Sequence, residues 1–145
     1  MVKSPSEALL LQRRLPVPPE KVFDAFTDPA RLARWFAPMD DWRTVVHELD
    51  AREGGRYRVD MVPPTGPPNR LHGTYTQLRR PDLLVFTWRW EGSPEETIVR
   101  IELTPIRGGC EMLLTHELFA GPDSTKQHAE GWEGCLARLP AALEG

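Results

Sequence analysis

Along most of its length the chain alternates apolar and polar side chains at every second position. This is the periodicity of β-strands that bury one face. The alternation is clearest where Tyr57, Val59 and Met61 share one face and charged residues take the other. Apolar runs of suitable length, several with the same alternation, predict further strands over residues 8–15, 43–51, 70–79, 83–91, 96–104 and 110–118. Short turns such as Gly108-Gly109 separate most of these segments, which is typical of antiparallel pairing.

Helical periodicity occurs in two places, after the first strand and towards residue 145. Pro19 and the pair Asp28-Pro29 predict two short helices, because proline suits the first helical turn and aspartate caps it. Residues 124–127 have the pattern of a capping box, so we expect Ser124 to cap the last helix. That helix carries an apolar stripe on one face, and Pro140 is expected to kink or end it.

Three glycines stand inside predicted elements, where glycine weakens the local structure. Gly73 lies in the middle of a strand and predicts a bend or bulge, as a sheet that curls would need. Gly131 and Gly134 lie in the middle of the last helix. They indicate either a close backbone approach or space that is kept open beside a cavity.

The order of these elements predicts an α+β protein in which strands precede one long helix. A length of 145 residues is that of one domain, and we expect its core to span about residues 8–143. The net charge is −3 with both signs interleaved, so the basic footprint of a nucleic-acid-binding protein is missing.

Membrane and secretory signals are also missing from the sequence. No stretch approaches the ~20 consecutive apolar residues of a membrane span. Residues 1–7 lack the basic and apolar segments of a secretory signal. We therefore expect a cytoplasmic protein, and leave a homodimer open.

Metal and cofactor motifs are not visible in the sequence. The four histidines form no HxH or HxxxH pair, and Cys110 and Cys135 fit no zinc spacing. We read the two cysteines as buried thiols rather than a disulfide. No glycine-rich phosphate loop or GxSxG motif is present, so we expect neither a metal nor another cofactor.

Several segments together resemble a known family. They are PPEKVFDAFTDPARLARWFAP (18–38), GGRYR (54–58), HGTY (72–75), LLVFTWRW (83–90), LLTHELF (113–119) and HAEGWEGCLARL (128–139). Their order and spacing resemble the heat-shock-protein ATPase-activator homologues of the START-like (SRPBCC) superfamily. The resemblance implies a helix-grip (START-like, Bet v 1-like) fold. In that fold a curved antiparallel sheet of about six to seven strands surrounds a long C-terminal helix, and two short helices follow the first strand.

The resemblance also implies a cavity between the sheet and the last helix, in which superfamily members bind hydrophobic molecules. The predicted inward faces carry an unusually large aromatic set that would line such a hollow. We therefore expect a small hydrophobic ligand, aromatic, acyl or lipid-like. The side chains expected to contact it are Trp35, Phe36, Tyr57, Val59, Met61, Tyr75, Phe86, Trp88, Trp90, Val99, Ile101, Met112, His116, His128 and Trp132.

Two further functions stay open beside ligand binding. His116 and Tyr75 are the candidates for general acid/base catalysis in a polyketide cyclase or dehydratase. The alternative for His116 is a core histidine satisfied by its neighbours. Some family members stimulate a chaperone ATPase. Because that role normally rests on a second domain, we do not transfer the stimulating activity to this chain. A chaperone partner is the third hypothesis.

Overall fold

The computed structural model describes residues 8–144 of the chain. Its elements follow the order that the sequence predicts, with strands before and after two short helices and one long helix at the end. They are β1 (Leu9–Leu15), α1 (Pro19–Thr27), α2 (Pro29–Leu32), β2 (Arg43–Leu49), β3 (Arg56–Val62), β4 (Asn69–Arg79), β5 (Leu83–Trp90), β6 (Thr97–Ile106), β7 (Gly109–Glu117) and α3 (Pro122–Leu143).

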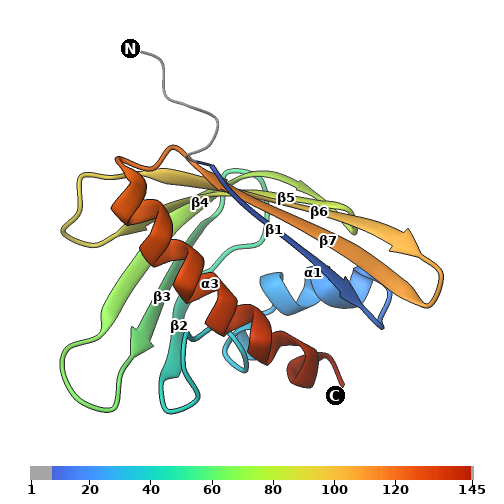
Figure 1. Ribbon diagram of the computed structural model, residues 1–145, viewed down its shortest axis with the longest axis horizontal. Coiled ribbons are helices and arrows are strands. Elements are labelled where there is room, and N and C mark those ends of the chain that lie inside the picture. Colours follow the sequence, from blue (N-terminus) through green and yellow to red (C-terminus); the bar gives the residue numbers. More distant parts are fainter. Residues whose placement is uncertain (1–7, 145) are drawn as a thin grey trace.

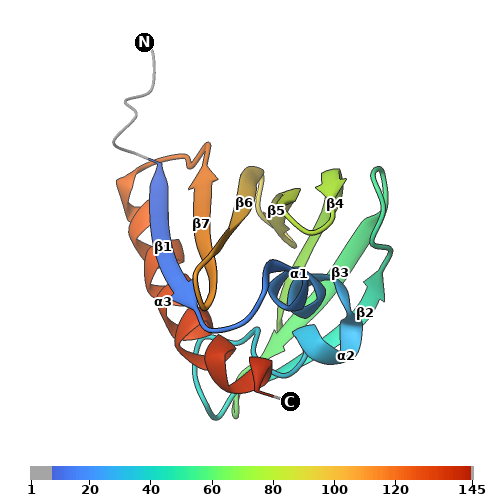
Figure 2. The ribbon, with the colours of Figure 1, turned by 90° about the vertical axis from the view of Figure 1, so that its right-hand side faces the viewer.

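All seven strands form one antiparallel sheet in the order β1-β7-β6-β5-β4-β3-β2. From β2 to β7, each strand pairs with the next strand in the sequence. Strand β1 pairs with β7 and forms the edge of the sheet opposite β2. Figure 1 shows α3 crossing the sheet, and Figure 2 shows the sheet curling with α1 and α2 inside the curl. The helix-grip architecture expected from the sequence is confirmed.

Strand β4 has two local irregularities where it meets its neighbours. A Cβ atom on Gly73 would lie 2.0 Å from the Thr87 carbonyl oxygen and 2.7 Å from the Tyr57 ring, so only glycine fits. The Tyr57 hydroxyl donates to that same Thr87 oxygen at 2.5 Å. The register of β4 against β5 shifts between Tyr75 and Gln77. The irregularity predicted at Gly73 is therefore a close approach at the glycine and a register shift just beyond it.

The two short helices begin as the sequence predicts. Pro19 opens α1, and the Asp28 side chain accepts a hydrogen bond from the backbone N–H of Ala30 at 3.0 Å at the start of α2. The regular part of α2 ends at Leu32, although the spacing of Leu32, Trp35 and Phe36 on one face predicts a helix that continues toward Pro38. Trp35 follows in a turn and Phe36 comes directly after it, and both are buried in the core.

The prediction for the start of α3 is wrong. The helix begins at Pro122 with Gly121 as its N-cap, one residue before proline at the first turn. The Ser124 hydroxyl donates instead to the Glu95 carboxylate at 2.8 Å. Glu95 lies between β5 and β6, so a contact distant in sequence replaces the local capping box. The helix also continues through Pro140 to Leu143.

Candidate functional site

The concave side of the sheet has two ends, and one of them is filled. Here α1, α2 and the turns after them pack against β3, β4 and β5. Trp35 is fully buried and donates its indole N–H to the Ala25 carbonyl at 3.0 Å. The void left between these elements measures only about 20 Å³. The side chains around it are Phe26, Leu32, Phe36, Tyr57, Val59, Tyr75 and Phe86.

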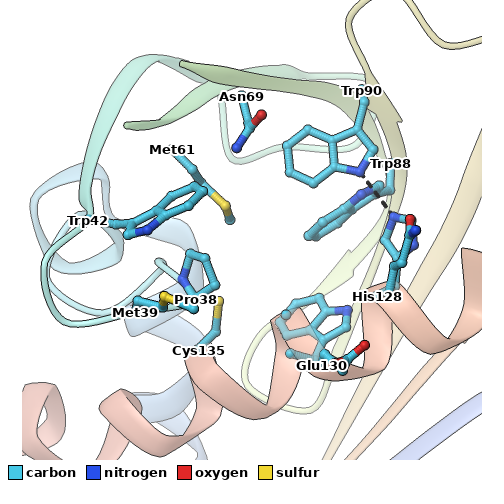
Figure 3. A pocket seen from close by; sticks show the side chains of 13 residues that line it. Pro38, Met39, Trp42, Met61, Asn69, Trp88, Trp90, His128, Glu130 and Cys135 are labelled. Carbon is cyan, nitrogen blue, oxygen red and sulfur yellow. Dashed lines mark hydrogen bonds between the residues drawn. The ribbon is translucent and has the colours of Figure 1, made fainter. Parts of the chain in front are cut away.

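The other end holds a pocket of about 490 Å³ between α3, the ends of β3, β4 and β5, and the loop before β2. Figure 3 shows Trp42 on one side of this pocket and Trp88 and Trp90 on the other. Four of the five tryptophans of the chain belong to its lining. The lining residues are Pro38, Met39, Trp42, Met61, Asn69, Trp88, Trp90, Gln127, His128, Glu130, Gly131, Trp132 and Cys135.

The side chains expected from the sequence to contact a ligand divide between three places. Met61, Trp88, Trp90, His128 and Trp132 line the pocket. Six others surround the filled end or pack within it, and the remaining four are buried on β6 and β7 without reaching the pocket. These ten are Trp35, Phe36, Tyr57, Val59, Tyr75 and Phe86, and then Val99, Ile101, Met112 and His116.

Sequence reasoning missed the residues that the loop before β2 contributes. Pro38, Met39 and Trp42 follow no periodic pattern, so nothing in the sequence assigned them a face. A signal did exist on α3. A Cβ atom on Gly131 would meet nothing within 4 Å, whereas one on Gly134 would lie 2.1 Å from the Pro38 carbonyl oxygen. Gly131 therefore leaves space at the pocket, and Gly134 lets the loop approach the helix.

His128 orients one wall of the pocket. Its Nδ1–H donates to the Ser124 carbonyl oxygen at 2.8 Å, because that oxygen can only accept. The Nε2 atom is then free to accept the indole N–H of Trp90 at 3.0 Å, as Figure 3 shows. These two bonds place the ring proton on Nδ1 and hold Trp90 against α3.

His116 lies deeper and is fully buried. Its Nδ1 accepts the indole N–H of Trp132 at 3.0 Å, so its proton is on Nε2 and is donated to Thr97 Oγ1 at 2.7 Å. The Thr97 hydroxyl in turn donates a hydrogen bond to the carbonyl oxygen of Trp88 at 3.2 Å. Burial, and secondarily the neighbouring His128, lowers the pKa of His116 from 6.5 to about 2. Both ring nitrogens are thus engaged within the protein, as for a satisfied core histidine.

Tyr75, the second catalytic candidate, packs its ring against Tyr57 and Phe86 with centroids 5.6 and 6.0 Å away. Burial raises the pKa of Tyr75 well above its usual value. Its side chain borders the filled end and not the pocket, so His116 and Tyr75 are not brought together. The geometry therefore offers no acid/base pair made of these two residues.

Two absences hold for residues 8–144. Within this range no helix is both long and apolar enough to cross a membrane. The same residues contain no group of three or more His, Cys, Asp or Glu side chains placed to hold a metal ion.

A curved antiparallel sheet closed on a long C-terminal helix defines the helix-grip, START-like class of proteins, which includes ligand-binding and polyketide cyclase-like domains. The family model described as "Activator of Hsp90 ATPase homolog 1-like protein" matches residues 16–144. The chain belongs to this family, as its sequence motifs indicated. No curated protein matches the sequence.

Solved structures of similar proteins cover nearly the whole chain. A protein from Chromobacterium violaceum is 29% identical with a TM-score of 0.85, over 97% of this chain and 99% of that one. The AHSA1 protein of Silicibacter pomeroyi is 28% identical with a TM-score of 0.83, over 94% and 97%. DynU16, a protein of the dynemicin biosynthetic locus, shares the fold at 23% identity and a TM-score of 0.79. That match covers 97% of this chain and 48% of DynU16.

Proposed function

We propose that the protein binds a small hydrophobic molecule in the pocket between the curved sheet and α3. The observation that carries this proposal is the gathering of four tryptophans around about 490 Å³ of space. Pockets for drug-sized ligands span about 300–1,000 Å³ and are mostly apolar with a few polar groups. Asn69, Gln127 and Glu130, all exposed, would supply those polar groups.

Within the set expected from the sequence, we assign ligand contact to Met61, Trp88, Trp90, His128 and Trp132. Trp42 joins them from the opposite side of the pocket. Large indole rings bury much apolar area with few rotatable bonds, so they bind a ligand at low entropic cost. The ten residues outside the pocket would instead support its walls.

The pocket can be tested with N-phenyl-1-naphthylamine, a neutral dye whose emission rises on entering an apolar site. We expect saturable binding to the wild-type protein. Gly131→Leu should abolish it, since its side chain would enter the open space beside Gly131 without striking the backbone. Lys126→Leu is the matched control, because Lys126 lies on α3, is exposed and does not line the pocket.

Circular dichroism and thermal unfolding establish that both variants fold. Dye binding that persists unchanged in Gly131→Leu would place the site elsewhere. Absence of dye binding to the wild-type protein would count against the proposed function itself.

Catalysis of the cyclase or dehydratase type receives less support from the pocket. Its titratable side chains are Glu130, His128 and Cys135 among residues 8–144. Both nitrogens of His128 are engaged, and burial raises the pKa of the Cys135 thiol to about 12.

The two buried cysteines are free, which fits the reducing cytoplasm that we propose as the location.

A chaperone partner is the remaining alternative, and the family description is its support. Adding the purified protein to an Hsp90 ATPase assay tests it directly. Stimulation of the ATPase would favour this function. An unchanged rate at saturating protein would remove it.

A further inference from the structure

The pocket carries one kind of charge. Glu130 is the only acidic side chain that lines it, and no Lys or Arg does, among the described residues 8–144. The Glu130 carboxylate is exposed and has no hydrogen-bond or ion-pair partner within that range. Figure 3 shows Glu130 on α3, below the labelled Trp88 and Trp90. A negative charge therefore stands unpaired at a site that no Lys or Arg of residues 8–144 lines.

Nearby groups that could attract an anion are either engaged or covered. Arg70 follows the lining residue Asn69, but its guanidinium lies 3.8 Å from Asp60 and 3.9 Å from Glu91. Both ring nitrogens of His128 are engaged, Nδ1 with the Ser124 carbonyl and Nε2 with the indole N–H of Trp90. The indole N–H of Trp88 has no acceptor, yet neighbouring atoms cover it. An anionic ligand would thus enter the pocket without a charged partner and beside a carboxylate.

The indole rings favour the opposite charge. The face of an indole attracts cations, and the attraction is worth more where water is excluded. Trp42 is half-buried and makes no ring–ring contact within residues 8–144, so no other aromatic ring occupies its faces. Trp90 is also half-buried and is held in place by His128. A cation between these rings would lie in a pocket that Glu130 also lines.

We propose that the pocket selects organic cations, namely amphipathic amines whose apolar body contacts the tryptophans and whose ammonium group is paired with Glu130. This inference rests on the proposed function, since it names the chemical class that the same pocket takes. It excludes fatty acids and other carboxylates as preferred ligands.

Three probes of nearly equal size and different charge test the proposal: 4-phenylbutylamine, 4-phenylbutanol and 4-phenylbutyrate. Isothermal titration calorimetry at neutral pH should give the tightest binding for the amine, weaker binding for the alcohol and the weakest for the carboxylate. We expect a preference of about tenfold for the amine over the alcohol, from the carboxylate and the indole faces together.

Glu130→Gln should lower the affinity for the amine far more than the affinity for the alcohol, and so remove most of that preference. Glu133→Gln is the matched control, because Glu133 is an exposed carboxylate on the same helix that does not line the pocket. It should leave the order of the three probes as it is. Raised salt should weaken the amine more than the alcohol.

The outcomes separate the two proposals. A carboxylate that binds as tightly as the amine, or an amine preference that survives in Glu130→Gln, overturns the selection of cations. If the alcohol still binds in either case, the pocket remains a ligand site of another specificity. If none of the probes binds while the dye does, the selection of cations fails and the proposed function stands. If the dye does not bind either, both proposals fail.

Discussion

Aromatic side chains fill one end of the concave face and line a pocket at the other end. At the filled end, rings from the sheet meet rings from α1 and the turns after α2, and about 20 Å³ remains. At the other end, rings from β5 and α3 face a loop instead of a helix, and about 490 Å³ remains. Alternation along a strand therefore decides which rings point inward. Whether they pack or line a pocket is decided by what covers them.

The largest expected effect contrasts a tryptophan from each end. Trp35→Ala should lower the free energy of unfolding by about 3–5 kcal/mol, since it deletes a fully buried ring and its hydrogen bond to Ala25. Trp42→Ala should cost less than about 1 kcal/mol, because Trp42 is half-buried beside open space. Urea denaturation measures both. Equal losses would show that the two ends are packed alike.

His116→Ala should cost about 2–4 kcal/mol. The substitution creates a cavity and leaves the indole N–H of Trp132 and the hydroxyl of Thr97 without their partner. His128→Ala, at the pocket, removes partly exposed bonds and should cost less. A loss at His128 that exceeds the loss at His116 would contradict the distinction between the buried and the open network.

The glycines of α3 should respond with opposite signs. Gly134→Ala forces a methyl group against the Pro38 carbonyl and should destabilise the protein by about 1–3 kcal/mol. Gly131→Ala adds a methyl group in open space and should stabilise the helix by about 0.5–1 kcal/mol. Thermal unfolding of the pair decides the matter, and destabilisation by Gly131→Ala would mean that the pocket is narrower than described.

A smaller effect concerns pH. The pKa of His116 is about 2 in the folded protein and near 6.5 when unfolded, so the unfolded state binds more protons as the pH falls. Stability should therefore be complete above pH ~6.5 and decline below it, by about 1 kcal/mol between pH 7 and 5.5 from this group. Urea titrations at both pH values should show a shallower decline in His116→Ala. An equal decline in both proteins would refute the assignment.

Much of the fold could be predicted because its signals are local. The strands, the proline at the start of α1 and the Asp28 cap each depend on residues a few positions apart. The start of α3 could not be predicted, because Glu95 binds Ser124 from a different part of the chain. The inward face of His116 followed from alternation, but its partners Thr97 and Trp132 lie on other elements.

The pocket itself was harder to place from the sequence. Its opening depends on where α1 and α2 stop filling the curl, and on a loop with no periodicity. Gly131 carried the clearest local hint, since a glycine in a helix needs a reason. The sequence did not distinguish Gly131 from Gly134, because the two glycines differ only in the atoms that face them in the folded protein.

Because the five tryptophans are unevenly distributed, intrinsic tryptophan fluorescence can report on the pocket. Four of them border the pocket, while Trp35 is sealed in the filled end at zero exposure. A molecule that enters should perturb the emission of the four and leave Trp35 as a constant background. Occupancy of the proposed site could then be followed through tryptophan emission, without any added label.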